Sequence, residues 1–360
     1  MRRILVTGGA GFIGSNFIRF ILHTAPDIFV VNLDLLTYAG SLENLKELPS
    51  PDRYTFIKGD ICDQGLVEKI IRQYEINHVV HFAAESHVDR SILGPGIFVQ
   101  TNIFGTFSLL EATRKVWLDE KKGDVEYMRF HHISTDEVYG SLAPGDPAFT
   151  ETTPYSPNSP YAASKAGSDH LVRAYSHTYN LPITISNCSN NYGPYQFPEK
   201  LVPLMITNAM EGKPLPLYGD GKQIRDWVLV DDHCEGIWQV IQFGRTGESY
   251  NIGGDNQPTN LEMVTSICGI LDQLNPSSPH KPHAGLITSV TDRPGHDRRY
   301  AMNINKIKKE LGWKPKHDLQ EGLLKTIQWY LAHGTWMESI RKQVGYQTWL
   351  EKNYTERVEK

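Results

Sequence analysis

The sequence has few cysteines, and their spacing excludes the usual roles of clustered thiols. Cys62, Cys188, Cys234 and Cys268 lie far apart, and none belongs to a C-x-x-C pair. This spacing argues against a disulfide framework and against a thiolate zinc site. It favours reduced thiols, and we therefore expect a cytoplasmic location.

Long hydrophobic runs and a strong excess of charge are also missing. No window reaches about 18 uncharged apolar residues, the length of a membrane-spanning helix. The short apolar run after Arg2 and Arg3 stops at Thr7, so we predict a first β-strand there and not a leader. A formal net charge of −5 argues against nucleic acid as a partner, because proteins that bind it usually carry a basic surface.

The fourteen histidines do not predict a metal site. The closest pair, His131 and His132, would point to opposite faces of a strand, and no third ligand lies at a usual spacing. We therefore expect no bound metal.

Short β-branched segments alternate with longer amphipathic segments along the first half of the chain. This alternation predicts an α/β fold with a Rossmann-like, doubly wound parallel sheet. The strands that we expect are Arg3–Thr7, Phe29–Asp34, Tyr54–Gly59, His78–Ala83, Arg129–Thr135 and Ile183–Cys188. The helices that we expect are Phe12–His23, Gly65–Tyr74, Thr101–Val116 and Pro160–Tyr179.

The regular pattern ends near residue 188, because Asn187–Tyr195 is too polar and too rich in turn residues for a core. We assign residues 1–188 to the Rossmann domain, with a returning segment at 226–253. Residues 189–225 and 254–330 are assigned to a smaller C-terminal lobe that binds the substrate. Residues 331–360 are expected to form a tail that docks on the core.

A glycine-rich turn follows the first expected strand and opens the first expected helix. Gly9, Gly11 and Gly14 match G-x-G-x-x-G, and Gly8, Gly11 and Gly14 match a three-spaced variant. Glycine permits a tight turn there and lets backbone N–H groups approach a pyrophosphate at the helix N-terminus. The motif in this strand–turn–helix context predicts dinucleotide binding.

Acidic residues at the next strand ends indicate which dinucleotide binds. Asp34 ends the second expected strand, twenty residues beyond Gly14. Its carboxylate can accept hydrogen bonds from ribose hydroxyls and would repel a 2′-phosphate, so we predict NAD and not NADP. Asp60 and Ile61, after the third strand, can flank the adenine, although Asp60 can equally cap the next helix.

Two further segments carry candidate catalytic groups. Ser134–Gly140 follows the fifth expected strand and contains the acidic pair Asp136–Glu137. Tyr161–Lys165 has a Y-x-x-x-K spacing on an expected helix. Residues four apart share a helix face, so Tyr161 and Lys165 can point at one cofactor. A nearby lysine charge favours the phenolate, which would let the tyrosine act as a base.

These segments resemble the extended short-chain dehydrogenases/reductases that act on sugar nucleotides. The adjacent carboxylates Asp136 and Glu137 resemble the 4,6-dehydratases of that family, whereas the 4-epimerases usually have small or hydroxyl residues there. The chain is similar to the dTDP-glucose 4,6-dehydratase branch over nearly its whole length, at Ala83–Ser91, His131–Ser134, Asn187–Tyr195, Gly219–Trp227, Arg293–Tyr300 and Tyr346–Leu350. One departure is Leu35, where such enzymes commonly have lysine.

The resemblance implies an enzyme, a lyase that converts dTDP-glucose to dTDP-4-keto-6-deoxyglucose and water with tightly bound NAD. Transient oxidation at C4 makes the C5 proton acidic, water leaves across C5 and C6, and hydride returns to C6. Tyr161, assisted by Thr135 and supported by Lys165, would take the O4 proton. Glu137 would remove the C5 proton, and Asp136 would protonate the departing C6 hydroxyl.

The resemblance also implies which residues contact the cofactor and the substrate. The cofactor contacts are Gly8, Gly11, Phe12, Ile13, Gly14, Asp34, Leu35, Leu36, Thr37, Asp60, Ile61, Phe82, Ala83, Ala84, Ser86, Thr101, Tyr161, Lys165 and Asn191. The substrate contacts are Ser86, Thr135, Asn190, Lys200, Leu201, Pro216, Leu217, Tyr218, Arg225, Asn260, Arg293 and His296. Arg225 would hold the diphosphate, because a planar guanidinium can bind phosphate through two parallel hydrogen bonds.

Three alternative functions stay open. A 4-epimerase needs no acid/base pair at C5 and C6, so Asp136 and Glu137 favour dehydration over it. A UDP-sugar 4,6-dehydratase would carry out the same reaction, and thymine differs from uracil by one methyl group, whose discrimination amounts to only about 1–3 kcal/mol. A non-catalytic nucleotide-binding scaffold would not need the tyrosine, the lysine and both carboxylates together.

The resemblance also implies an assembly and a pathway. Such enzymes are commonly homodimers packed through helices like Thr101–Val116 and Pro160–Tyr179. They usually supply deoxysugars such as rhamnose for polysaccharide biosynthesis. We expect no nucleic-acid or membrane partner.

Overall fold

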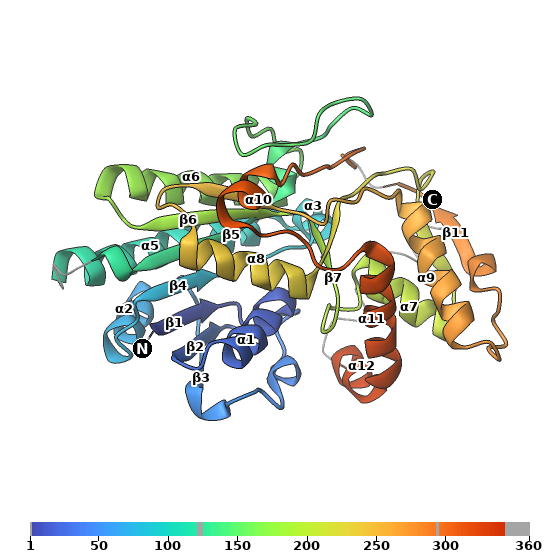
Figure 1. Cartoon of the computed structure of the whole chain (residues 1–360), viewed down its shortest axis with the longest axis horizontal. Coiled ribbons are helices and arrows are strands. Elements are labelled where there is room, and N and C mark those ends of the chain that lie inside the picture. Colours follow the sequence, from blue (N-terminus) through green and yellow to red (C-terminus); the bar gives the residue numbers. More distant parts are fainter. Residues whose placement is uncertain (1, 121–124, 293–294, 343–360) are drawn as a thin grey trace.

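A seven-stranded parallel sheet forms the centre of the computed structural model, which describes residues 2–120, 125–292 and 295–342 (Figure 1). In spatial order its strands are β10 (Ser249–Ile252), β6 (Ile183–Cys188), β5 (Arg129–Thr135), β4 (His78–His81), β1 (Arg2–Thr7), β2 (Ile28–Asp34) and β3 (Tyr54–Lys58). The chain builds outward from β1 to β3 and then continues on the other side of β1, from β4 to β10. The predicted doubly wound sheet is therefore confirmed.

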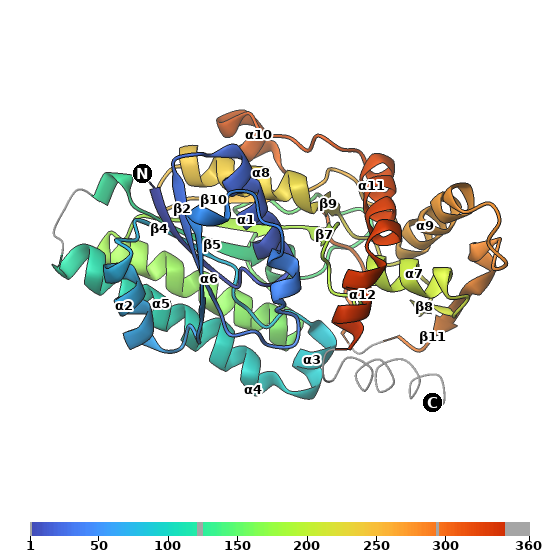
Figure 2. The same cartoon turned by 90° about the horizontal axis from the view of Figure 1, so that it is seen from below.

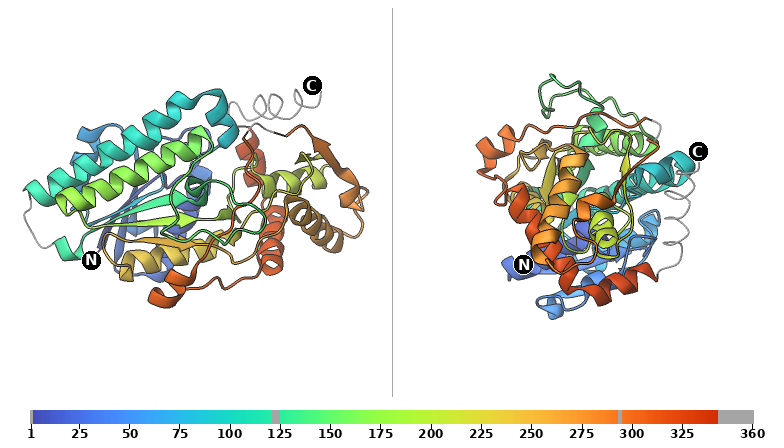
Figure 3. Two further views of the ribbon diagram at one scale, coloured as in Figure 1. Left: turned by 90° about the horizontal axis from the view of Figure 1, so that it is seen from above. Right: turned by 90° about the vertical axis from the view of Figure 1, so that its right-hand side faces the viewer.

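Helices cover both faces of this sheet (Figure 2). On one face α1 (Phe12–Thr24) packs against α8 (Val230–Phe243), with α10 (Asn305–Leu311) beside α8 and β10. On the other face α5 (Thr106–Arg114) lies between α2 (Gln64–Gln73) and α6 (Pro160–Tyr179), and Figure 3 shows α5 and α6 running side by side. Among the described residues, no helix is both long enough and apolar enough to cross a membrane.

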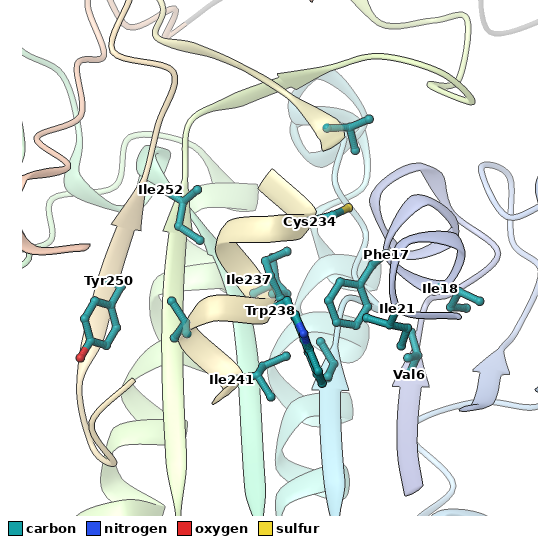
Figure 4. Close-up of a cluster of buried hydrophobic side chains, with 14 of the residues drawn as sticks. Val6, Phe17, Ile18, Ile21, Cys234, Ile237, Trp238, Ile241, Tyr250 and Ile252 are labelled. Atoms are coloured by element: carbon teal, nitrogen blue, oxygen red, sulfur yellow. The ribbon is translucent and has the colours of Figure 1, made fainter. Parts of the chain in front are cut away.

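The middle of β1, Ile4–Val6, is continuously apolar because both faces of the sheet are covered. In β1, Ile4 and Val6 belong to the core on the side of α1 and α8, whereas Leu5 belongs to the core on the opposite side. Alternate residues of a strand point to opposite faces, so one short run supplies two cores. Phe17 of α1 and Trp238 of α8 lie together in the first core (Figure 4).

The helix predicted at Thr101–Val116 differs from the observed one. The regular α-helical part, α5, is flanked by π-helical stretches at Val99–Gly105 and Lys115–Glu120. Two short helices, α3 (Val88–Leu93) and α4 (Pro95–Phe98), lead into it. A π-helical turn takes in an additional residue, which changes the direction of the following side chains in a way that 3.6-residue periodicity does not predict.

A second lobe lies beyond the carboxyl ends of the strands (Figure 1). It contains two small parallel sheets, one of β7 (Asn190–Tyr192) and β9 (Trp227–Leu229), the other of β8 (Leu215–Tyr218) and β11 (Ile287–Val290). The helices α7 (Leu201–Met210), α9 (Asn260–Leu274), α11 (Leu319–Ala332) and α12 (Gly334–Arg341) pack around a core of their own. Between β9 and β10 the chain returns to the edge of the large sheet.

The last described helices dock on both lobes. Trp329 of α11 packs against Tyr195, with ring centres 4.6 Å apart. The indole N–H of Trp336 in α12 donates to the side-chain oxygen of Asn44 at 2.9 Å. The part of the predicted docking tail beyond residue 342 lies outside the described residues.

Candidate active site

A cavity of about 450 Å³ opens where the carboxyl ends of the sheet strands face the second lobe. Residues that follow β1, β2, β4, β5 and β6 line it, together with residues of α6, α7 and β8. In doubly wound sheets, ligands bind outside the carboxyl ends of the strands where the strand order reverses, which here is between β1 and β4. This cavity is therefore the candidate active site.

The predicted site residues converge on this one cavity. All of them that the structure describes line its wall, except Leu36. Leu36 has a φ of 58°, and its side chain packs against the core beside α1. Arg293 lies outside the described residues.

The turn between β1 and α1 has the geometry that a phosphate cradle requires. Gly8 has a φ of 72°, and a Cβ atom at Gly14 would lie 2.4 Å from the carbonyl oxygen of Gly8. Helix α1 follows Gly11 with no side-chain cap on its first N–H groups. These N–H groups and the helix dipole can bind a pyrophosphate, so the residues present fit a dinucleotide.

Asp34 ties the end of β2 to this cradle. Its Oδ2 accepts from the N–H of Ala10 at 2.8 Å, and its Oδ1 accepts from the N–H of Leu36 at 2.8 Å. Burial raises the pKa of Asp34, while these two hydrogen bonds lower it. Each carboxylate oxygen has a second lone pair, so Asp34 can also accept from a ribose hydroxyl. Leu35 beside it brings no charge to the cavity wall.

Asp60 and Ile61 line the cavity after β3. Asp60 accepts from the N–H of Cys62 at 2.8 Å, whereas the cap of α2 is Asp63, which accepts from the N–H of Leu66 at 2.9 Å. Asp60 therefore stabilises the turn after β3 and does not cap the helix.

Asp136 and Glu137 begin a short 3₁₀ turn at the end of β5. The hydroxyl of Thr135 accepts from the N–H of Glu137 at 3.3 Å and caps this turn. Asp136 is 1% exposed, and burial, followed by the charges of Glu137 and Asp226, raises its pKa well above the usual value. Its Oδ2 is buried without a hydrogen-bond partner among the described residues. These surroundings favour the protonated form of the carboxyl group, which is suited to donate a proton.

Tyr161 and Lys165 lie one turn apart near the start of α6, where Ser159 caps the helix. The Nζ of Lys165 donates to the carbonyl oxygen of Ile133 at 2.7 Å. We expected the lysine to favour the phenolate form of the tyrosine. Burial, followed by the charge of Glu137, instead raises the pKa of Tyr161 well above its usual value. A positive charge beside Tyr161 would oppose this effect and favour its action as a base.

Arg225 lines the cavity from the loop before β9. Its Nη1 donates to the carbonyl oxygen of Ile224 at 2.7 Å, and its Nη2 donates to that of Asp297 at 2.8 Å. The guanidinium carbon lies 4.2 Å from the ring centre of Tyr300. These contacts fix the plane of the guanidinium, and a fixed planar cation is suited to a diphosphate.

Hydrogen bonds between described residues join the second lobe to the sheet side of the cavity. The Nζ of Lys200 donates to the carbonyl oxygen of Ser86 at 3.2 Å. The hydroxyl of Tyr218 donates to Oδ2 of Asp89 at 3.2 Å. Substrate contacts predicted on separate lobes are thus part of one continuous wall.

A buried acidic cluster in the cavity wall was not predicted from the sequence. Arg90 lies 3.0 Å from Glu199, and its guanidinium carbon lies 3.9 Å from the ring centre of Tyr38. Burial raises the pKa of Glu199 and of the neighbouring Glu85. These residues come from distant segments that meet only in the folded protein, so no local motif signals them.

Comparison with known proteins gives consistent results across sequence and structure. The chain matches the family model described as GDP-mannose 4,6 dehydratase over residues 5–326. A dTDP-glucose 4,6-dehydratase from Salmonella typhimurium is 53% identical over 360 residues, which cover 98% of this chain and 99% of that protein. One from Neisseria meningitidis serogroup B is 56% identical over 342 residues, which cover 94% of this chain and 96% of that protein.

A solved structure is similar over the same extent. The crystal structure of a dTDP-glucose 4,6-dehydratase from Streptomyces venezuelae, with NAD bound, superposes with a TM-score of 0.84 at 47% sequence identity. The match covers 94% of this chain and 99% of that chain.

Proposed function

We propose that this chain, which belongs to the dTDP-glucose 4,6-dehydratases of the extended short-chain dehydrogenase/reductase family, converts dTDP-glucose to dTDP-4-keto-6-deoxyglucose and water. It is an NAD-dependent lyase. The observation that carries the proposal is the acidic pair Asp136 and Glu137, which shares one cavity with Tyr161 and with the phosphate cradle. An epimerase would not need both carboxyl groups.

The chemistry of the reaction explains why a dehydratase has a dinucleotide cradle. The C5 proton of the glucosyl unit is not acidic until C4 is a ketone. A bound NAD would supply a positive charge, a hydride acceptor for C4 and the hydride that is later needed at C6. Gly8, Gly14 and Asp34 would hold its pyrophosphate and ribose.

Each remaining step is a proton transfer by a residue of this chain. Tyr161, hydrogen-bonded to Thr135, takes the O4 proton. Glu137 takes the C5 proton, and Asp136 gives its proton to the C6 hydroxyl, which leaves as water. Glu137 then returns its proton to C5. Tyr161 has gained one proton and Asp136 has lost one, so a proton passes from the first to the second before the next turnover.

The second lobe is proposed to hold the nucleotide part of the substrate. Arg225 and Lys200 supply the positive charge for the diphosphate. The other proposed contacts are Ser86, Asn190, Leu201, Pro216, Leu217, Tyr218, Asn260, Arg293 and His296. On this proposal residues 1–188 and 226–253 bind NAD, residues 189–225 and 254–330 bind the sugar nucleotide, and residues 331–360 form the docking tail.

We also propose a cytoplasmic homodimer. An apolar face on α3, α4, the following π-helical stretch and α5 supports the dimer, since a monomer rarely exposes so many large apolar side chains together. Its residues, which we call the apolar face, are Ile92, Leu93, Ile97, Val99, Phe104 and Phe107. The four free cysteines fit the location.

Mass spectrometry of the sugar nucleotide tests the proposed reaction. Purified protein is incubated with NAD and dTDP-glucose, with UDP-glucose in parallel. Loss of the mass of one water from dTDP-glucose is expected, with slower conversion of UDP-glucose. An unchanged mass with inverted configuration at C4 would indicate an epimerase, and no conversion of either substrate would favour a binding protein.

A further inference from the structure

Asp169 is a buried carboxylate to which the proposed reaction assigns no task. It lies on α6, one turn beyond Lys165, and has no exposed surface. Its Oδ2 accepts from the hydroxyls of Ser134 at 2.6 Å and Tyr155 at 2.9 Å. The Nε2 of His132 lies 3.1 Å from its Oδ1. A charged group in this position needs a partner of opposite charge or a full set of hydrogen bonds.

The other titratable groups that face Lys165 carry no compensating charge. His132 on β5 lies 3.4 Å from the lysine Nζ, and His81 on β4 and Cys188 on β6 also face it. Burial lowers the pKa of His132 to about 4 and that of His81 well below its usual value, and it raises the pKa of Cys188 to about 12. At neutral pH, none of these groups carries a negative charge that could balance the ammonium of Lys165. The phenol of Tyr161 is neutral too.

On its other side, Asp169 faces two tyrosines and one further cation. Burial raises the pKa of Tyr139 and of Tyr155, so both are neutral. Arg173, one turn further along α6, is half-buried, and its Nη2 donates to the hydroxyl of Ser249 at 2.7 Å. Arg173 can balance part of the charge of Asp169. However, its position near the edge of the sheet leaves it accessible to water, which weakens the attraction between the two charges.

Lys165 is the cation that most needs the carboxylate. It is 5% exposed, and burial lowers its pKa, while the charge of Asp169 opposes that change. Burial raises the pKa of Asp169, but the neighbouring His132, followed by the charge of Lys165, holds it below its usual value. His132 lies close to both charged groups, at 3.1 and 3.4 Å.

We propose that Asp169 is a positioning residue for the reaction proposed above: it is the buried counter-ion that keeps Lys165 protonated and directed at Tyr161. The Nε2 atom of His132 lies close to both groups, and its ring carries no charge itself. The proposal rests on the proposed function in one respect, that Lys165 must be charged while Tyr161 takes the O4 proton. Asp169 does not touch the substrate and acts only through the lysine.

A double-mutant cycle tests the pairing without reference to activity. The free energy of unfolding of the full chain is measured in urea for Asp169→Asn, Lys165→Met and the double variant. Asp169→Asn should destabilise the parent protein but should be neutral or stabilising in the Lys165→Met background, where it removes an uncompensated charge. Equal destabilisation in both backgrounds, or loss of folding in both, would overturn the pairing.

The pH dependence of the first half-reaction tests the consequence for the chemistry. The reduction of bound NAD by dTDP-glucose is followed by absorbance in a single turnover. In Asp169→Asn, the alkaline loss of rate should move to lower pH by about one unit, since removal of a nearby opposite charge lets the lysine lose its proton sooner. If Asp169→Asn slowed the reaction but left its pH profile unchanged, Asp169 would have only a structural role.

Tyr155→Phe is the matched control. It removes a hydrogen bond to Oδ2 of Asp169 and leaves the charge of the carboxylate in place. The alkaline loss of rate in Tyr155→Phe should occur at the same pH as in the parent protein. A shift as large as that of Asp169→Asn would contradict the counter-ion role. If the parent protein does not reduce NAD at all, the proposed function fails, while the unfolding cycle still decides whether Asp169 and Lys165 are paired.

Discussion

At the scale of single residues, two neighbouring carboxyl groups have different surroundings. Asp136 is almost fully buried, which raises its pKa and favours its protonated form, whereas Glu137 beside it is only half-buried. Elimination of water needs one group that gives a proton and one that takes a proton, and the two surroundings suit these opposite tasks. A sequence shows that the two residues are adjacent, but their difference in burial arises only in the folded protein.

Glu137→Gln should separate the oxidation of the sugar from the loss of water. The amide cannot take the C5 proton, so the cofactor should become reduced and remain so, while formation of the keto-deoxysugar falls by about 100- to 10,000-fold. Absorbance of the reduced cofactor and the mass of the sugar nucleotide measure the two events in one sample. Full dehydration by this variant would contradict the role of Glu137.

Tyr161→Phe is the control for that experiment. It removes the base for the O4 proton, so neither reduction of the cofactor nor loss of water should exceed about one hundredth of the parent rates. Rapid reduction of the cofactor by this variant would mean that another group takes the O4 proton.

At the scale of secondary-structure elements, the phosphate cradle depends on how closely β1 and α1 approach each other. In Gly14→Ala the new methyl group would lie 2.4 Å from the carbonyl oxygen of Gly8. Relief of such overpacking costs about 1–3 kcal/mol, and we expect roughly 10- to 100-fold weaker retention of NAD. The cofactor content of the purified protein and its rate of loss on dilution measure this change.

Gly269→Ala, within α9, is the matched control for the cradle. An added Cβ there meets no atom within 4 Å, so the substitution should stabilise the helix by about 0.4–1 kcal/mol and leave the NAD content unchanged. Equal cofactor content in the two alanine variants would contradict the role of the cradle.

The sequence predicts some elements better than others, for physical reasons. Arg129–Thr135, Ile183–Cys188 and Pro160–Tyr179 are observed with the predicted bounds, because β-branched and aromatic residues favour the two strands and a serine cap marks the start of the helix. Helix Thr101–Val116 was predicted less well, since its π-helical ends do not follow the periodicity of an α-helix.

Some residues of the candidate site could likewise be predicted from the sequence, and others could not. Residues that belong to local motifs, such as Gly14 and Lys165, could be predicted because strand–turn–helix geometry places them without help from the rest of the chain. Glu199 and Asp169 could not, because their roles depend on contacts with Arg90 and His132, which lie more than thirty residues away in the sequence.

At the scale of the whole molecule, the apolar face on α3 to α5 determines the expected assembly. Phe107→Asp would place a carboxylate in the centre of a dimer contact and should weaken dimerisation by at least about 100-fold. Sedimentation over a range of protein concentrations measures the change. Phe243→Asp is the control, because Phe243 is 62% exposed at the end of α8, away from the apolar face. Identical sedimentation of both variants would contradict the proposed dimer contact.

In the proposed reaction, this cavity removes water from a sugar through an internal transfer of hydride. The decisive measurement uses dTDP-glucose that carries deuterium at C4, incubated with the purified protein and NAD in ordinary water. The product should have lost one water and should retain the deuterium, now on C6, as nuclear magnetic resonance can show. Deuterium that is lost to the solvent, or that stays on C4, would rule out an internal hydride transfer.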